Sequence, residues 1–140
     1  MPVLEQVLEQ YPDKVKVVFK HYPLRNHQYA FKAATAAMAA HGQGKFWEFH
    51  DALFQNYKQL NDQKIDQIAG ELGLDLTAFQ QNRQSAEVEE IVRRDMQDAV
   101  SADVRGTPSV FINGRLLKTR SIGGFKQAIE AELQRLAAGK

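Results

Sequence analysis

Apolar residues along this chain recur mainly with the spacing of α-helices. In Pro2–Gln10, for example, Val3, Leu4, Val7 and Leu8 fall on one helical face. The same periodicity predicts further helices at residues 30–41 and 45–57, from Asn61 or Asp62 to residue 72, in a short turn after Asp75 or Thr77, and after Ser85 and Ser121. Most of the chain is therefore predicted to be helical.

Polar residues that favour helix N-termini stand before several of these segments. The side-chain oxygens of Ser85 and Ser121 are predicted to accept an N–H from the first helical turn, and Gly73 is predicted to end the helix before it. The segment at 45–57 is the most apolar, and we expect it to centre a helical core through Phe46, Trp47, Phe49, Leu53, Phe54 and Tyr57. The last helix is predicted to turn inward Phe125, Ile129, Leu133 and Leu136.

Two stretches depart from the helical pattern. Residues 15–22 place Val15, Val17 and Phe19 on one side and Lys16 and Lys20 on the other, which predicts a strand near a sheet edge. Residues 109–112 read as a strand that runs into an Asn-Gly pair, and residues 115–118 can return beside it as a type I′ hairpin. The long helical connection between the two stretches favours a parallel crossover.

Composition adds limits to this α/β pattern. With 44% hydrophobic and 25% charged residues, the 140-residue chain has the balance of one globular domain. The formal net charge is +1, and the basic residues are scattered among acids, which argues against nucleic-acid binding. No apolar run approaches the roughly 20 residues of a membrane span, and no signal peptide is evident at the start. The chain contains no cysteine, so it has no thiolate nucleophile.

Several segments together carry a resemblance to one family. Residues 104–114 read V-R-G-T-P-S-V-F-I-N-G, residues 18–24 read V-F-K-H-Y-P-L, and residues 44–54 read G-K-F-W-E-F-H-D-A-L-F. With the Pro2 helix and G-L-D at 73–75, these resemble the DsbA-like thioredoxin-fold thiol-disulfide oxidoreductases. The resemblance implies a thioredoxin-like α/β fold with a DsbA-type helical insertion at residues 28–103, between thioredoxin-fold parts at 1–27 and 104–140. It also implies that the fold is truncated before its first core strand, which would carry Cys-x-x-Cys.

The same resemblance implies a substrate-binding loop at Gly106, Thr107, Pro108 and Ser109. In the family this cis-proline loop faces the cysteines and pairs its backbone with an extended segment of a protein substrate. Without sulfur, disulfide transfer cannot run, and we expect no catalytic residue and no cofactor in this chain. The substrate and the redox partner stay undetermined.

Other candidate chemistry is weaker. The four histidines, His21, His27, His41 and His50, include no pair at i,i+4 on one helix, so we expect no metal site. Ser109 and Ser121 lack the nucleophile-elbow context of a hydrolase, and the paired acids lie on solvated helix faces.

Three explanations for the missing cysteines stay open. The favoured one is an incomplete product; the others are a redox-inactive peptide-binding module and an oligomeric structural protein. Loss of a central strand would expose unpaired strand edges at 15–22 and 109–112, so we expect self-association rather than an ordinary monomer. The compartment is not determined, although members of this family are commonly periplasmic or exported.

Overall fold

The computed structural model describes residues 2–139, and the chain separates into two compact units. The helical unit spans Lys20–Asp103, and the terminal unit joins the chain up to Phe19 with the chain from Val104 onward. The division expected from the sequence, a helical insertion at 28–103 between thioredoxin-fold parts at 1–27 and 104–140, stays a prediction. Each unit has a hydrophobic core of its own.

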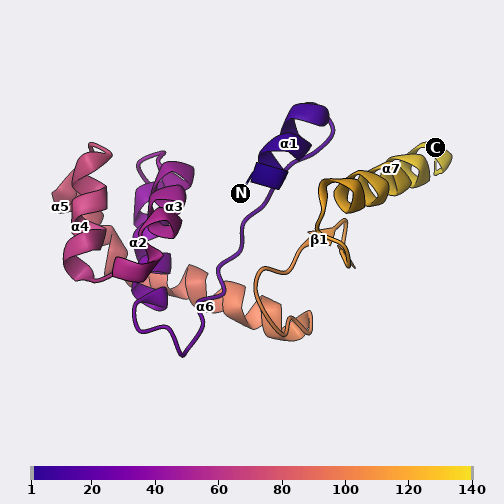
Figure 1. Ribbon diagram of the computed structural model, residues 1–140. Helices are drawn as coiled ribbons and strands as arrows, with labels where there is room; N and C mark the ends of the chain where they lie inside the picture. The colour runs from indigo at the N-terminus through magenta and orange to yellow at the C-terminus, as the bar shows by residue number, and fades with distance from the viewer. Residues whose placement is uncertain (1, 140) are drawn as a thin grey trace. The chain divides into compact units, whose positions relative to one another are not determined.

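Five α-helices and one short 3₁₀ helix make up the described helical unit (Figure 1). They are α2 (Ala30–His41), α3 (Phe46–Gln55), η1 (Tyr57–Gln59), α4 (Asp62–Glu71), α5 (Leu76–Arg83) and α6 (Ala86–Ser101). The alanines of α2 are almost all buried, and their small side chains let α3, α4, α5 and α6 pack closely around that helix. The rings of Phe49 and Phe79 meet in the core with centroids 5.6 Å apart.

The terminal unit combines two helices with a small hairpin. Its elements are α1 (Pro2–Gln10), β1 (Phe111–Ile112), β2 (Arg115–Leu116) and α7 (Ile122–Ala138). The strands pair antiparallel, with Phe111 opposite Leu116 and Ile112 opposite Arg115. The buried core consists of Val7 and Tyr11 from the α1 side and Phe125 and Ile129 from α7.

The helix caps predicted from sequence are confirmed, and the open choices are resolved. Asn61 caps α4 by accepting the Lys64 N–H at 2.7 Å, and Asp75 caps α5 by accepting the Ala78 N–H at 3.1 Å. The hydroxyls of Ser85 and Ser121 cap α6 and α7 in the same way, at 3.2 and 3.1 Å. Gly73 follows α4 with φ of +72°, as expected of a residue that ends a helix.

The predicted strand at residues 15–22 is wrong. These residues form no β-strand, although Val15 and Val17 are half-buried and Lys16 and Val18 are exposed. Buried and exposed side chains therefore alternate as in a strand, but within the described chain no neighbouring strand is present to pair with the N–H and C=O groups of this segment. Within residues 2–139, only β1 and β2 form such a ladder.

Some predicted core positions are also wrong. Trp47, Phe54 and Tyr57 are 45%, 63% and 65% exposed. The buried face of α3 consists of Phe49, His50 and Leu53, whereas Tyr57 lies beyond the end of α3, in η1. Leu136 is 59% exposed near the C-terminal end of α7, beyond the part of that helix that covers the hairpin. In the described chain, no helix has both the length and the apolar character needed to cross a membrane.

Candidate functional site

The loop that the sequence singled out lies in the terminal unit, just before β1. Gly106, Thr107, Pro108 and Ser109 are all exposed, and the Thr107–Pro108 peptide bond is cis. None of the four residues has a titratable acidic or basic side chain. The loop therefore offers hydrogen-bonding groups rather than titratable ones.

Two side chains hold this loop in place. The Ser109 hydroxyl donates a hydrogen bond to the Gly106 carbonyl at 2.6 Å, which closes the loop across Thr107 and Pro108. The Arg120 guanidinium, in the segment between β2 and α7, donates to the Pro108 carbonyl. A charged donor makes a stronger hydrogen bond than a neutral one, so Arg120 is the firmer of the two restraints.

The hairpin anchors the loop to the core of the terminal unit. Asn113 and Gly114 have φ of +48° and +81°, as a type I′ turn requires. The Leu117 N–H donates to the Val110 carbonyl at 2.8 Å, one pair beyond the strands toward the loop. Val110, Ile112 and Leu117 are half-buried and pack against the core of this unit.

A glycine sets the position of Arg120. The segment before α7 approaches the first turn of that helix so closely that a Cβ on Gly124 would lie 2.0 Å from the Thr119 carbonyl oxygen. Only a residue without a side chain fits there. The Ser121 cap and Gly124 together fix the chain at Thr119 and Arg120, and so bring the guanidinium to Pro108.

The backbone of Thr107 is the group best placed to bind something. Within the described chain, its N–H and C=O make no hydrogen bond to the protein. A residue that precedes proline is held near extended geometry, in which these two groups can pair with an extended partner segment. Within the described residues, the loop thus offers one backbone donor and one backbone acceptor that have no partner, and its side chains include neither a thiol nor a titratable group.

The histidines lie apart from this loop, in the helical unit. His21 and His50 are buried rather than on the surface, and both rings lie about 5.9 Å from the ring of Phe46. Burial lowers the pKa of His21 and the nearby His50 lowers it further, whereas Asp95 opposes them. Among the described residues, no group of three His, Cys, Asp or Glu side chains could hold a metal ion.

Arg120 is the contact at this site that the sequence did not reveal. It stands directly before a helix cap, where any polar residue is tolerated, and its reach to Pro108 depends on how the chain returns after the hairpin. The close approach at Gly124 could have suggested it, because consecutive glycines in the first turn of a helix are poor helix formers.

Comparison with known proteins agrees with this architecture. The family model described as DSBA-like thioredoxin domain matches residues 1–130. Among solved structures, a thioredoxin-like oxidoreductase from Silicibacter pomeroyi DSS-3 superposes with a TM-score of 0.82 at 26% sequence identity, covering 96% of this chain and 77% of that one. The fold is therefore thioredoxin-like, as the sequence predicted.

Curated relatives are found within much longer proteins. The chain is 36% identical over 115 residues to the Na(+)/H(+) antiporter NhaA 3 of Salinispora tropica, covering 81% of this chain and 18% of the antiporter. It is 36% identical over 106 residues to the Na(+)/H(+) antiporter NhaA of Herminiimonas arsenicoxydans, covering 76% of this chain and 17% of the antiporter. The chain thus spans less than a fifth of the length of these relatives.

Proposed function

This chain belongs to the DSBA-like thioredoxin domain family, and we propose that it acts there as a redox-inactive module that holds an extended polypeptide along Thr107. The observation that supports this best is the exposed loop whose Thr107 backbone groups have no partner among the described residues. The module would bind by adding the partner as a strand to the Thr107 backbone.

Chemistry supports the redox-inactive part of the proposal. Thiol-disulfide exchange begins when a thiolate attacks a disulfide sulfur and forms a mixed disulfide. This chain has no sulfur in cysteine form, so neither the attacking nor the resolving thiol is present. The methionine thioethers cannot replace them, because they carry no S–H bond to ionise.

Binding to Thr107 would be modest and sequence-tolerant. A backbone pair offers one donor and one acceptor, each worth about 0.5–1.5 kcal/mol net. Arg120 and the Ser109–Gly106 hydrogen bond would lower the entropic cost by holding the loop before the partner arrives. We therefore expect recognition of extended, unfolded segments in preference to folded surfaces.

One experiment tests both parts. The protein is mixed with insulin and dithiothreitol, and reduction of the insulin disulfides is followed by turbidity; the rate should equal that of buffer. Binding of an unstructured peptide is then measured by NMR, with protection of the Thr107 amide from hydrogen exchange as the expected signature. Catalysed reduction, or binding that leaves the Thr107 amide unprotected, would overturn the corresponding part.

Variants at one position sharpen the test. Thr107→Pro removes the backbone donor and should weaken binding about fivefold or more, whereas Thr107→Ala keeps it and should bind like the wild type. A peptide in which the pairing amide is replaced by an ester tests the complementary hydrogen bond on the unchanged protein, because the ester has no N–H to donate to the Thr107 carbonyl. Equal binding of the amide and ester peptides would contradict backbone pairing.

A second candidate function is self-association through unpaired backbone. Lys16, Val17 and Val18 make no backbone hydrogen bond within the described chain, and Val18 is 67% exposed. Such a segment can pair with the same segment of a second copy. Sedimentation over a range of concentrations tests this: a dimer with slow amide exchange at residues 16–18 supports it, and a monomer contradicts it.

A further inference from the structure

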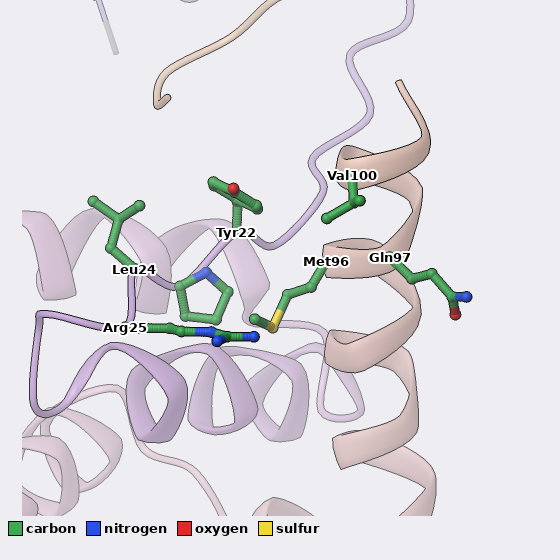
Figure 2. A pocket seen from close by; sticks show the side chains of 7 residues that line it. Tyr22, Leu24, Arg25, Met96, Gln97 and Val100 are labelled. Carbon is green, nitrogen blue, oxygen red and sulfur yellow. The ribbon is translucent and has the colours of Figure 1, made fainter. Parts of the chain in front are cut away.

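The helical unit contains a pocket that the proposed function does not use. It has a volume of about 370 Å³ and lies between residues 22–25 and the C-terminal half of α6, where it is lined by Tyr22, Pro23, Leu24, Arg25, Met96, Gln97 and Val100 (Figure 2). This volume falls at the small end of the range of about 300–1,000 Å³ that ligand pockets occupy. It suits one or two amino-acid residues of a bound molecule.

A pair of α6 carboxylates holds the loop wall of the pocket against the helix. Asp95 accepts a hydrogen bond from the backbone N–H of His21 at 2.9 Å, and Asp98 accepts one from the ammonium of Lys20 at 2.7 Å. The same ammonium lies 3.8 Å from Asp95. Residues 20 and 21, which directly precede the lining residue Tyr22, are thereby fixed against α6, so the two walls keep their spacing.

These contacts leave the pocket with a positive charge. Both acidic groups of this part of α6 are already engaged by Lys20 and the backbone of His21. Within residues 2–139, the exposed Arg25 makes no hydrogen bond or ion pair. Figure 2 shows its side chain running toward the sulfur of Met96, which lines the same pocket, so the guanidinium points into the pocket.

The rest of the lining is apolar, with one further polar group. Pro23, Met96 and Val100 form the apolar surface, and Val100 is 71% exposed although it is a valine on a helix. Gln97 also belongs to the lining, although Figure 2 shows the amide end of its side chain turned away from Met96. The Tyr22 hydroxyl has no hydrogen-bond partner in the described chain and can donate to a ligand carbonyl.

We propose that this pocket binds the C-terminal residue of a polypeptide whose last side chain is apolar. The α-carboxylate would pair with Arg25, since a guanidinium matches a carboxylate with two parallel hydrogen bonds. The side chain on the same Cα would rest on Met96, Pro23 and Val100. The preceding peptide carbonyl would accept from Tyr22. A pocket this small requires charge and apolar group to be close together, which a C-terminal residue provides and an internal acidic residue does not.

The experiment uses the whole chain and two matched probes, N-acetyl-Leu-Leu with a free carboxylate and its C-terminal amide. Binding is followed by the methyl resonances of Met96 and Val100, with Met38 in α2 as an internal reference outside the pocket. We expect the acid to shift Met96 and Val100 saturably and to bind about fivefold or more tightly than the amide.

Two substitutions locate the charge that gives this preference. Arg25→Gln should abolish the difference between acid and amide, and Arg94→Gln, at an exposed position of α6 outside the pocket lining, should preserve it. The proposal is overturned if acid and amide bind equally, if the preference survives Arg25→Gln, or if the Met38 resonance shifts in place of that of Met96.

Octanoate is a further control for the kind of ligand. Tighter binding of octanoate than of the peptide acid would assign the pocket to a fatty acid and overturn the peptide assignment. Thr107→Pro leaves this pocket unchanged, so its result is independent of the loop proposal.

Discussion

The two units of this chain bury their cores by different means. In the described chain, the core of the helical unit includes twelve buried residues and that of the terminal unit includes four. The helical unit relies on alanines of α2 that let large side chains from other helices approach, among them Phe49, Phe79 and Ile65. The terminal unit relies on Phe125 and Ile129 against α1, together with a hydrogen bond of 2.8 Å from the Tyr11 hydroxyl to Glu130.

This difference bears on where function is located. Regions with few buried apolar contacts open most easily, and binding segments are often drawn from them. The exposed loop at Thr107 belongs to the thinly buried terminal unit, whereas the pocket beside Arg25 is built on the densely packed helical unit. We therefore expect the loop to adapt to its partner and the pocket to keep its shape.

The largest effect is expected from a cavity in the helical core. Phe79 is completely buried against Phe49, so Phe79→Ala removes a whole ring from a closed core and should cost about 3–5 kcal/mol in free energy of unfolding. Urea unfolding followed by amide exchange in α2 and α5 measures this loss. The control is Phe54→Ala on α3, where the ring is 63% exposed and the expected change is about 0.5 kcal/mol or less. Similar losses for the two variants would refute the assignment of the core.

A smaller effect is expected at the close approach in the terminal unit. Gly124→Ala would place a Cβ 2.0 Å from the Thr119 carbonyl oxygen, and the required backbone shift should cost about 1–3 kcal/mol. The same shift should move Arg120 away from Pro108 and weaken peptide binding at Thr107. Gly123→Ala is the matched control, because its nearest neighbour would be the Ser121 hydroxyl at 3.9 Å and alanine favours the helix. A stable Gly124→Ala variant with unchanged hairpin resonances would argue against the tight turn.

Features that depend on local sequence could be predicted. The caps at Asn61, Asp75, Ser85 and Ser121 and the Asn113–Gly114 turn each involve residues only a few positions apart, and each is found as expected. The thioredoxin-like fold was also identified, because the motif at residues 104–114 carries enough specific positions in one continuous stretch.

Features that depend on distant partners could not be predicted. Residues 15–22 have the alternation of a strand but no neighbouring strand to pair with, and sequence pattern cannot supply one. The reach of Arg120 to Pro108 and the burial of His21 and His50 are likewise set by how separate segments meet. Trp47 and Phe54 were placed in the core by composition alone, although the packing of α3 uses only one of its faces.

The smallest effect is expected in the pH dependence of stability, which should differ between the two units. All four histidines belong to the helical unit, and burial is the main cause that lowers the pKa of His21. The unfolded chain then takes up a proton at a higher pH than the folded chain does, so stability is complete above about pH 6.5 and falls as pH drops through that region. Urea midpoints of helical-unit amides should decrease from pH 7.5 to pH 5.5, while those of the terminal unit stay nearly constant.

Two variants test the assignment to His21. His21→Gln should reduce the dependence of the helical-unit urea midpoint on pH, and Asp95→Asn should steepen it, because the carboxylate of Asp95 favours the protonated ring. A slope that is equal in both units, or one that survives His21→Gln unchanged, would show that another group controls it.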